Sequence, residues 1–317
     1  MKSLPVCRAD RLAEQPAEQR WLIESLWTDQ AVGIVGGEPK CCKSFLALDL
    51  AVAVASGADA LRRFRTVQTG PVLLYAGEDP LHVVRGRLQG IAHAAGVTFE
   101  GLDIHAITAP TLRLDLRADQ QRLVETVRTV RPKLLVLDPF VRLHRIDENA
   151  AAEVAPVLGF LRNLQRRFGT AVLLVHHARK AANHVRAGQA LRGSSELHAW
   201  GDSNLYLRRK GEQLILAVEH RAAPSGEELT LELKACGPGL ALHRVEPPME
   251  PAEVVTTSNP AQRIEHALAT SSRALTQRQL RRACRMRTET VGQALADLVD
   301  QGRVLRAGDG YRLAARG

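Results

Sequence analysis

The sequence lacks any long apolar run. Residues 1–20 carry charges throughout, and the apolar stretch after Lys43 contains Asp49 and is too short to cross a bilayer. We therefore expect neither a signal peptide nor a membrane span. The sequence predicts a soluble, cytoplasmic protein without membrane contacts.

Cysteine is also scarce. The five cysteines are odd in number and lack the spacing of a zinc site. Cys41 and Cys42 are neighbours in sequence, which is a poor geometry for a structural disulfide or a metal clamp. This usage fits a reducing compartment.

Acidic residues are too few to balance the basic ones, and the 317 residues carry a net charge of +9. Residues 261–317 alone hold eleven arginines and five acidic residues, so two thirds of the excess lies in the last fifth of the chain. This concentration favours an anionic polymer as the partner of the tail. The alternative is an arginine-rich codon bias, because arginine is plentiful throughout and lysine is not.

From residue 31 to about 180, runs typical of buried strands alternate with stretches of helical periodicity. Such alternation predicts an α/β fold with a mainly parallel sheet covered on both faces. After residue 200, four strand-length runs separated by turns predict antiparallel hairpins added to one edge. The main strands are expected at 31–36, 71–77, 133–138 and 170–176, and the helices at 80–95, 118–130 and 151–168.

The sequence divides into four segments. Residues 1–30 are expected to be a lead-in, whose apolar stripe from Trp21 to Trp27 we interpret as a helix packed on the core. Residues 31–246 form the α/β domain, and the Pro- and Thr-rich residues 247–260 predict a linker. Residues 261–317 have the order helix, helix, turn, helix and hairpin, with Thr276 as the cap of the second helix. This is the plan of a winged helix-turn-helix domain.

Residues 31–55 organise the rest of the chain. A short apolar run, a glycine-rich turn, Lys43-Ser44 and a helical pattern follow one another, as in a phosphate-binding loop. Lys43 would add charge at the β and γ phosphates of ATP, and the Ser44 hydroxyl would hold Mg²⁺. A chance match is the alternative. The expected nucleotide-binding residues are Gly37, Glu38, Pro39, Lys40, Cys41, Cys42, Lys43, Ser44 and Phe45.

Acidic residues end two of the expected strands. Glu78 is expected to be the general base that polarises the attacking water. Capping the next helix is the alternative role, although Asp79 is the better candidate for the cap. Asp138 closes the run LLVLD, a Walker B arrangement in which the carboxylate helps to hold Mg²⁺.

His176 and His177 close a further strand. Adjacent side chains of a strand point to opposite faces, so one histidine is expected in the ligand crevice and the other in the packing of the sheet. The histidine in the crevice could sense the γ-phosphate. A core histidine with satisfied hydrogen bonds is the alternative for either residue.

Two long basic loops, 140–150 and 179–195, leave these strand ends. Because they contain few aromatic residues, they are expected to contact nucleic-acid phosphates rather than stack on bases. A solvated basic surface is the alternative. The candidate residues are Arg142, Arg145, Arg179, Lys180, Arg186 and Arg192.

The segments GGEPKCCKS, YAGEDP, LLVLDPF, VLLVHHARK and LRGSS, in this order, resemble the RecA-fold ATPases of the RepA type. These are plasmid replication helicases related to the DnaB group of ring-shaped hexamers. The resemblance covers roughly residues 28–245. It implies a RecA-like core, ATP hydrolysis at the subunit interfaces of a homohexamer, and single-stranded DNA in the channel. The implied catalytic residues are Glu78 as base, Asp138 as Walker B acid, Arg87 near the nucleotide, His177 as γ-phosphate sensor and Arg221 as arginine finger.

Three positions depart from this pattern. Cys42 replaces the second glycine of G-x-x-x-x-G-K-[ST], so a Cβ must fit there. Glu219 replaces the lysine of the K-x-R-x-G stretch that contains the finger in the DnaB group. Asp202 stands where the RepA pattern has an arginine after RGSS.

The tail resembles winged helices in general. Its third helix would place its N-terminus in the major groove of duplex DNA, although some winged helices make protein contacts instead. The candidate DNA-binding residues of the tail are Arg285, Arg287, Arg303 and Arg306.

Three functions remain open on the sequence alone. The first is an ATP-driven DNA motor, a helicase or translocase acting in replication of a mobile element. The second is an ATP-gated DNA-binding regulator or recombination mediator without unwinding activity. The third is a KaiC-like signalling ATPase with no nucleic-acid role.

Overall fold

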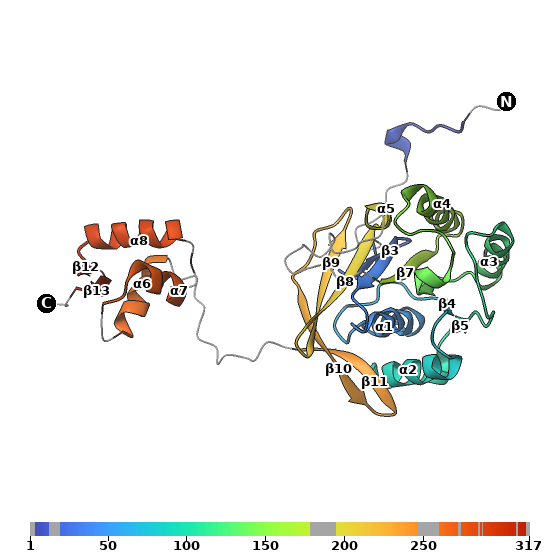
Figure 1. The fold of residues 1–317 in the computed structure, drawn as a ribbon, viewed down its shortest axis with the longest axis horizontal. Helices are drawn as coiled ribbons and strands as arrows, with labels where there is room; N and C mark the ends of the chain where they lie inside the picture. The colour runs from blue at the N-terminus through green and yellow to red at the C-terminus, as the bar shows by residue number, and fades with distance from the viewer. Residues whose placement is uncertain are drawn as a thin grey trace. The chain divides into compact units, whose positions relative to one another are not determined.

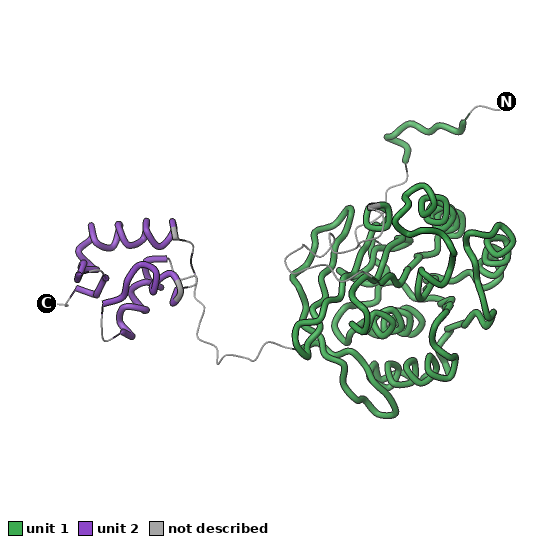
Figure 2. Tube along the Cα trace, viewed as in Figure 1, with its two compact units in different colours: residues 1–246 green, residues 247–317 purple. Residues whose placement is uncertain are grey.

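The computed structural model describes residues 4–12, 20–177, 195–245, 260–271, 274–284, 286, 288–308 and 310–314. The chain forms two compact units, residues 1–246 and 247–317 (Figure 2). Each unit has a buried core of its own. In these described ranges, no helix combines the length and the apolarity that a membrane span needs.

A nine-stranded sheet organises the first unit (Figure 1). Its strands are β3 (Val32–Gly37), β4 (Val72–Ala76), β5 (Ile104–Ala106), β6 (Leu134–Asp138), β7 (Ala171–His177), β8 (Ser203–Lys210), β9 (Gln213–His220), β10 (Leu229–Cys236) and β11 (Gly239–Arg244). Their order is β11-β10-β9-β8-β3-β7-β6-β4-β5. Pairing is parallel from β5 to β8 and antiparallel from β8 to β11. The expected mainly parallel sheet with antiparallel strands at one edge is confirmed.

Helices cover both faces of this sheet. On one face lie α1 (Lys43–Ser56) and α2 (Leu81–Ala94), and on the other α3 (Arg117–Val130) and α4 (Ala151–Phe168) (Figure 1). The expected helices correspond to α2, α3 and α4 within one residue at each end. The shorter elements of this unit are α5 (Ser195–Trp200), η1 (Ala9–Arg11), η3 (Phe99–Gly101) and η4 (Phe140–Arg142).

The segment before β3 is a hairpin, and the helix expected there is wrong. β1 (Trp21–Ile23) pairs antiparallel with β2 (Trp27–Thr28), and Ser25 turns the chain with a left-handed φ of 61°. Aromatic and branched side chains favour the extended backbone. The apolar side chains of both arms are buried apart from the half-buried Trp21, so the expected contact with the core exists.

Two glycines hold α2 against the antiparallel edge of the sheet. A Cβ on Gly90 would lie 2.8 Å from the Leu240 nitrogen, and a Cβ on Gly239 would lie 2.9 Å from the Gly90 Cα. Backbone meets backbone here, so a side chain at either position would push α2 away from β11. This contact fixes the far end of the helix that begins beside Glu78.

The second unit packs three helices and a hairpin around a small core that includes Leu280, Val291 and Leu298. At the start of its second helix, Thr276 Oγ1 accepts from the Gln279 N–H, while Gln279 Oε1 accepts from the Thr276 N–H. This capping box confirms the expected cap. The elements are α6 (Pro260–Ala269), α7 (Gln277–Cys284), α8 (Thr288–Asp300), β12 (Val304–Ala307) and β13 (Gly310–Leu313).

The substitution Gly90→Ala is expected to lower the free energy of unfolding by about 1–3 kcal/mol, the usual penalty of overpacking. Gly86→Ala, one turn earlier in α2, is the matched control because no atom lies within 4 Å of its added Cβ. Its better helix propensity predicts stabilisation of up to about 1 kcal/mol. Urea unfolding followed by circular dichroism measures both. Equal effects of the two variants would contradict the close contact.

Candidate nucleotide-binding site

Four parallel strands end at one edge of the sheet and bring the predicted site residues together. The register pairs Gly37 of β3 with His177 of β7, and Ala76 of β4 with Asp138 of β6. Glu78 follows β4 by two residues. In open α/β sheets the ligand crevice lies outside the carboxyl ends of the strands. Residues 37–45, which we call the phosphate loop, run from the end of β3 into α1.

Lys43 lies buried at the start of α1. Its ammonium donates hydrogen bonds to the carbonyl oxygens of Gly37 at 3.0 Å and Glu38 at 2.7 Å. Burial lowers the pKa of Lys43, and the charge of Asp138 partly offsets this effect. The Lys43 ammonium and the Asp138 carboxylate thus place opposite charges at the same end of the parallel strands.

Cys42 takes the glycine position of the loop with a glycine-like backbone. Its φ of 62° and ψ of 28° are left-handed, a conformation that costs a residue with a Cβ about 1–3 kcal/mol. Gly37 has a φ of 152°, and a Cβ on it would lie 2.1 Å from the Leu207 carbonyl oxygen. The loop thus needs glycine at its first position and tolerates strain at its second.

The two thiols of the phosphate loop are held in the protonated form. Cys41 is buried, and its Sγ donates to the Glu38 carbonyl oxygen at 2.8 Å. Burial raises the pKa of Cys41 and of the half-buried Cys42. Since the thiolate is the reactive form, neither side chain is set up as a nucleophile.

The surroundings of Asp138 disfavour its ionised form. Burial raises its pKa to about 6, the hydrogen bond from Ser44 lowers it, and the charges of Asp79 and Glu78 raise it further. Three carboxylates therefore concentrate negative charge beside a serine hydroxyl. Oxygen ligands of this kind suit Mg²⁺.

Ser44 and Asp138 are the residues that would hold Mg²⁺. Among the described residues, no group of three or more His, Cys, Asp or Glu side chains could hold a metal ion by itself. In nucleotide sites, one or two protein oxygens commonly hold Mg²⁺, and water and the nucleotide's phosphates complete its coordination.

Glu78 and Asp79 each pair with an arginine. Asp79 binds Arg87 of α2 through two hydrogen bonds of 2.5 and 3.1 Å, and Arg87 lies over the ring of Phe45 at 5.0 Å. The expected cap by Asp79 is wrong, because α2 starts after Pro80 without a side-chain cap. Two charge-assisted hydrogen bonds to a guanidinium are stronger than one cap. Glu78, as expected, does not cap the helix and accepts from Arg142 at 2.9 Å.

The two histidines of β7 point to opposite faces, as predicted. His177 lies 3.9 Å from Glu78 on the side of the phosphate loop, with its pKa lowered by partial burial and by Lys43. His176 is buried on the other face, against Phe140. The crevice therefore receives His177, and His176 belongs to the packing of the sheet.

The structure also has a cluster of polar side chains around the partly buried Glu148 that the sequence did not reveal. Glu148 lies 3.3 Å from His144 and 3.9 Å from His176. Burial opposes the ionisation of Glu148, but the two histidines outweigh it and lower its pKa. The three residues come from β7 and from loop 140–150, and no spacing pattern links them.

Arg209 of β8 is a second residue that the sequence did not reveal. Its guanidinium donates to the Lys40 carbonyl oxygen at 2.9 Å and so ties the phosphate loop to the neighbouring strand. Arg209 lies 169 residues after Lys40. Without the fold, nothing in the sequence brings these two residues together.

Arg221 lies at the end of the strands opposite to the phosphate loop. It follows β9, whose His220 pairs with Ser203 at the start of β8, whereas Gly37 pairs with Leu207 near the end of β8. Its side chain is half-exposed and lies 3.3 Å from Asp202. The structure does not bring Arg221 to the phosphate loop of its own chain.

The DNA-binding candidates fall into three groups. Arg142 and Arg145 are exposed on loop 140–150, beside the site. In the second unit, Arg303 pairs with Glu265 at 2.6 Å and Arg306 lies over Tyr311 at 5.9 Å. The other candidates lie outside the described residues, and they are Arg179, Lys180, Arg186, Arg192, Arg285 and Arg287.

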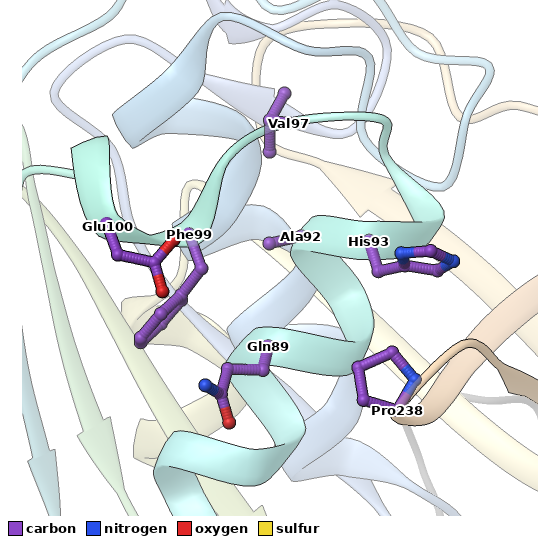
Figure 3. Close-up of a pocket in the computed structure, with 7 residues that line it drawn as sticks. All are labelled: Gln89, Ala92, His93, Val97, Phe99, Glu100 and Pro238. Atoms are coloured by element: carbon purple, nitrogen blue, oxygen red, sulfur yellow. The ribbon is translucent and has the colours of Figure 1, made fainter.

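A cavity of 250 Å³ lies elsewhere, between the second half of α2 and the turn that joins β10 to β11 (Figure 3). Gln89, His93, Phe99, Glu100 and Pro238 line it. None of these residues belongs to the phosphate loop or to the strand ends described above. The cavity is therefore separate from the candidate nucleotide site.

The fold and the site define an α/β domain of the P-loop ATPase class. The chain belongs to the AAA domain family, whose model matches residues 2–183, more than half of the sequence. Among solved structures, one titled "Crystal structure of the RadB recombinase" is similar to the chain at 19% sequence identity and a TM-score of 0.48. The match covers 69% of this chain and 92% of that chain.

Asp138→Asn is expected to stabilise the nucleotide-free protein at pH 8 by up to about 3 kcal/mol. The pKa of Asp138 is raised to about 6, so the stability that its protonation contributes is complete below about pH 4 and lost as the pH rises through 6. The variant's advantage should therefore disappear at acidic pH. Urea unfolding at pH 4.5, 6 and 8 without Mg²⁺ measures it.

Glu125→Gln is the control for this experiment, because Glu125 is an exposed carboxylate on α3. It should change stability little at each pH. An effect of Asp138→Asn that stays constant between pH 4.5 and 8 would contradict the raised pKa.

Proposed function

We propose that the chain is a Mg²⁺-dependent ATPase that acts on DNA as a ring-forming motor, a helicase or translocase of the RepA type. The observation that carries this proposal is the convergence of Lys43, Asp138 and Glu78 at one sheet edge, from which the basic loop 140–150 also leaves. A site that hydrolyses ATP beside a phosphate-binding surface can couple turnover to movement along a strand.

We propose the following roles for the residues of the site. The N–H groups of the phosphate loop and the N-terminus of α1 bind the β and γ phosphates together with Lys43. Ser44 and Asp138 would hold Mg²⁺, which would supply positive charge at the phosphate oxygens. Glu78 accepts a proton from the attacking water while the oxygen of that water forms a bond to the γ-phosphorus. The bond from that phosphorus to the β–γ bridging oxygen breaks, and ADP and phosphate leave.

The residues around Glu78 complete the proposed machinery. His177, 3.9 Å from Glu78, would contact the γ-phosphate and respond to its loss. Arg87 is held beside the nucleotide edge by Asp79 and Phe45. Arg221 would act on the nucleotide of a neighbouring copy, since its half-exposed side chain lies at the edge opposite its own phosphate loop.

Nucleic acid would be contacted at two places. In the first unit, Arg142 and Arg145 of loop 140–150, with Arg179, Lys180, Arg186 and Arg192 of the second loop, would bind the phosphates of a single strand. In the second unit, the order α6-α7-α8-β12-β13 supports a winged helix, with α8 as recognition helix and β12–β13 as wing. Arg285, Arg287, Arg303 and Arg306 would then contact duplex DNA.

A second candidate is an ATP-gated DNA-binding regulator or recombination mediator. The ion pair between Arg221 and Asp202 favours it, because the pair engages the arginine that a ring-forming motor would need at its subunit interface. A strand-displacement assay separates the two candidates. Unwinding in proportion to ATP turnover supports the motor, and DNA binding that depends on ATP without unwinding supports the regulator.

Lys43→Ala is expected to abolish DNA-stimulated ATP hydrolysis, and Glu78→Gln to lower kcat by about 10²–10⁴-fold, the usual contribution of a general base. Glu78→Gln should keep its affinity for a fluorescent ATP analogue, whereas Lys43→Ala should lose it. ATPase and fluorescence titrations measure both effects. Unchanged DNA-stimulated hydrolysis by Lys43→Ala would refute the proposed site.

Mixing the Glu78→Gln and Arg221→Ala proteins is expected to restore hydrolysis that neither variant has alone. In a mixed oligomer, the intact Glu78 of one copy meets the intact Arg221 of the next. ATPase activity against mixing ratio measures the rescue, with Glu78→Gln mixed with Lys43→Ala as the control, because both defects then lie in the same site. Equal activity in the two mixtures would exclude Arg221 as a finger.

A further inference from the structure

Glu78, the base of the proposed reaction, is held by an arginine from the basic loop. Its Oε1 accepts a hydrogen bond from Arg142 Nε at 2.9 Å, and its Oε2 lies 3.9 Å from His177 Nε2. Arg142 ends η4, the first turn of loop 140–150. The carboxylate that must take the proton of water is thus engaged by the segment proposed to bind nucleic acid.

The backbone fixes the approach of Arg142 to Glu78. A Cβ on Gly77 would lie 3.0 Å from the Cβ of Arg142, so the two segments pass closely because residue 77 has no side chain. The Gly77 N–H also donates to the Asp138 carbonyl oxygen at 2.7 Å. Arg142 and Glu78 therefore meet where the ends of β4 and β6 are hydrogen-bonded to each other.

The ion pair between Arg142 and Glu78 is also weak enough for Arg142 to change partners. The side chain of Arg142 is 59% exposed and that of Glu78 is 40% exposed. Ion pairs with this exposure contribute little net free energy, because water and salt screen them. A phosphate offers the guanidinium two parallel charge-assisted hydrogen bonds, which is a better partner than the single bond to Glu78.

We propose that Arg142 restrains Glu78 until a nucleic-acid phosphate captures the guanidinium. When Arg142 binds a phosphate of the nucleic acid instead, Glu78 keeps His177 as its neighbour. Its carboxylate is then free to orient the attacking water. This inference rests on the proposed function. It adds an account of how binding of single-stranded nucleic acid sets the rate of ATP hydrolysis. Arg142 is a positioning residue, since it acts through Glu78 and touches no reacting atom.

Arg142→Gln in the full chain tests this assignment. Without nucleic acid, its kcat is expected to rise about two- to fivefold, the range that corresponds to losing an exposed pair of up to about 1 kcal/mol. Stimulation by a single-stranded oligonucleotide should fall toward onefold. The matched control is Arg128→Gln, which removes another exposed, paired arginine on α3, away from the site. The control should keep both the basal rate and the stimulation of the wild type.

Two further variants separate restraint from a general disturbance. The double variant Glu78→Gln, Arg142→Gln should be as slow as Glu78→Gln alone, because the gain passes through Glu78. Arg142→Lys keeps the charge and should retain most of the stimulation. Thermal unfolding should give all variants the Tm of the wild type within a few degrees, as expected for exposed positions.

The outcomes distinguish this inference from the proposed function. If the wild type hydrolyses ATP and responds to the oligonucleotide, but Arg142→Gln has an unchanged or lower basal rate, the restraint is refuted and the motor remains. A double variant faster than Glu78→Gln would also refute it. If the wild type neither hydrolyses ATP nor responds to the oligonucleotide, both proposals fall.

Discussion

Parallel pairing of β3, β7, β6 and β4 is the constraint on which the site depends. Each strand contributes one functional group within two residues of its carboxyl end or through the loop that follows it. The pairing fixes how far along the strands these groups lie. The alternation of side chains along each strand fixes the face of the sheet to which they point. A shift of β7 by one residue would turn His177 into the packed face and His176 into the crevice. The chemistry therefore depends on register as much as on residue type.

Two of the three carboxylates at this edge form an ion pair with an arginine. Asp79 has Arg87 and Glu78 has Arg142, whereas Asp138 has the neutral hydroxyl of Ser44. Burial is the main reason why the pKa of Asp138 is raised to about 6, and the charges of Asp79 and Glu78 add to this effect. A divalent cation would offset this negative charge, as the proposed role of Asp138 in holding Mg²⁺ requires. The same arrangement leaves the two arginine pairs to orient Glu78 and the start of α2.

The sequence predicted the elements of the sheet well because long runs of buried apolar residues and helical periodicity are local signals. It missed the hairpin of residues 21–28, whose arms are too short to show either period. The pairing of Asp79 with Arg87 was also missed. An aspartate just before a helix can either cap that helix or form an ion pair, and the sequence does not distinguish the two roles. Contacts such as Arg209 with Lys40 and Arg142 with Glu78 join distant segments. They are set by the strand order, for which no local pattern exists.

The close contact between Gly90 and Gly239 gives α2 a mechanical part to play. This helix of 14 residues, about 21 Å long, begins just after Glu78 and Asp79, and its second half meets β11 backbone to backbone. Because no side chain separates them, α2 and β11 can shift little relative to one another at this contact. A tilt of α2 at its end near Glu78 would therefore move β11 as well.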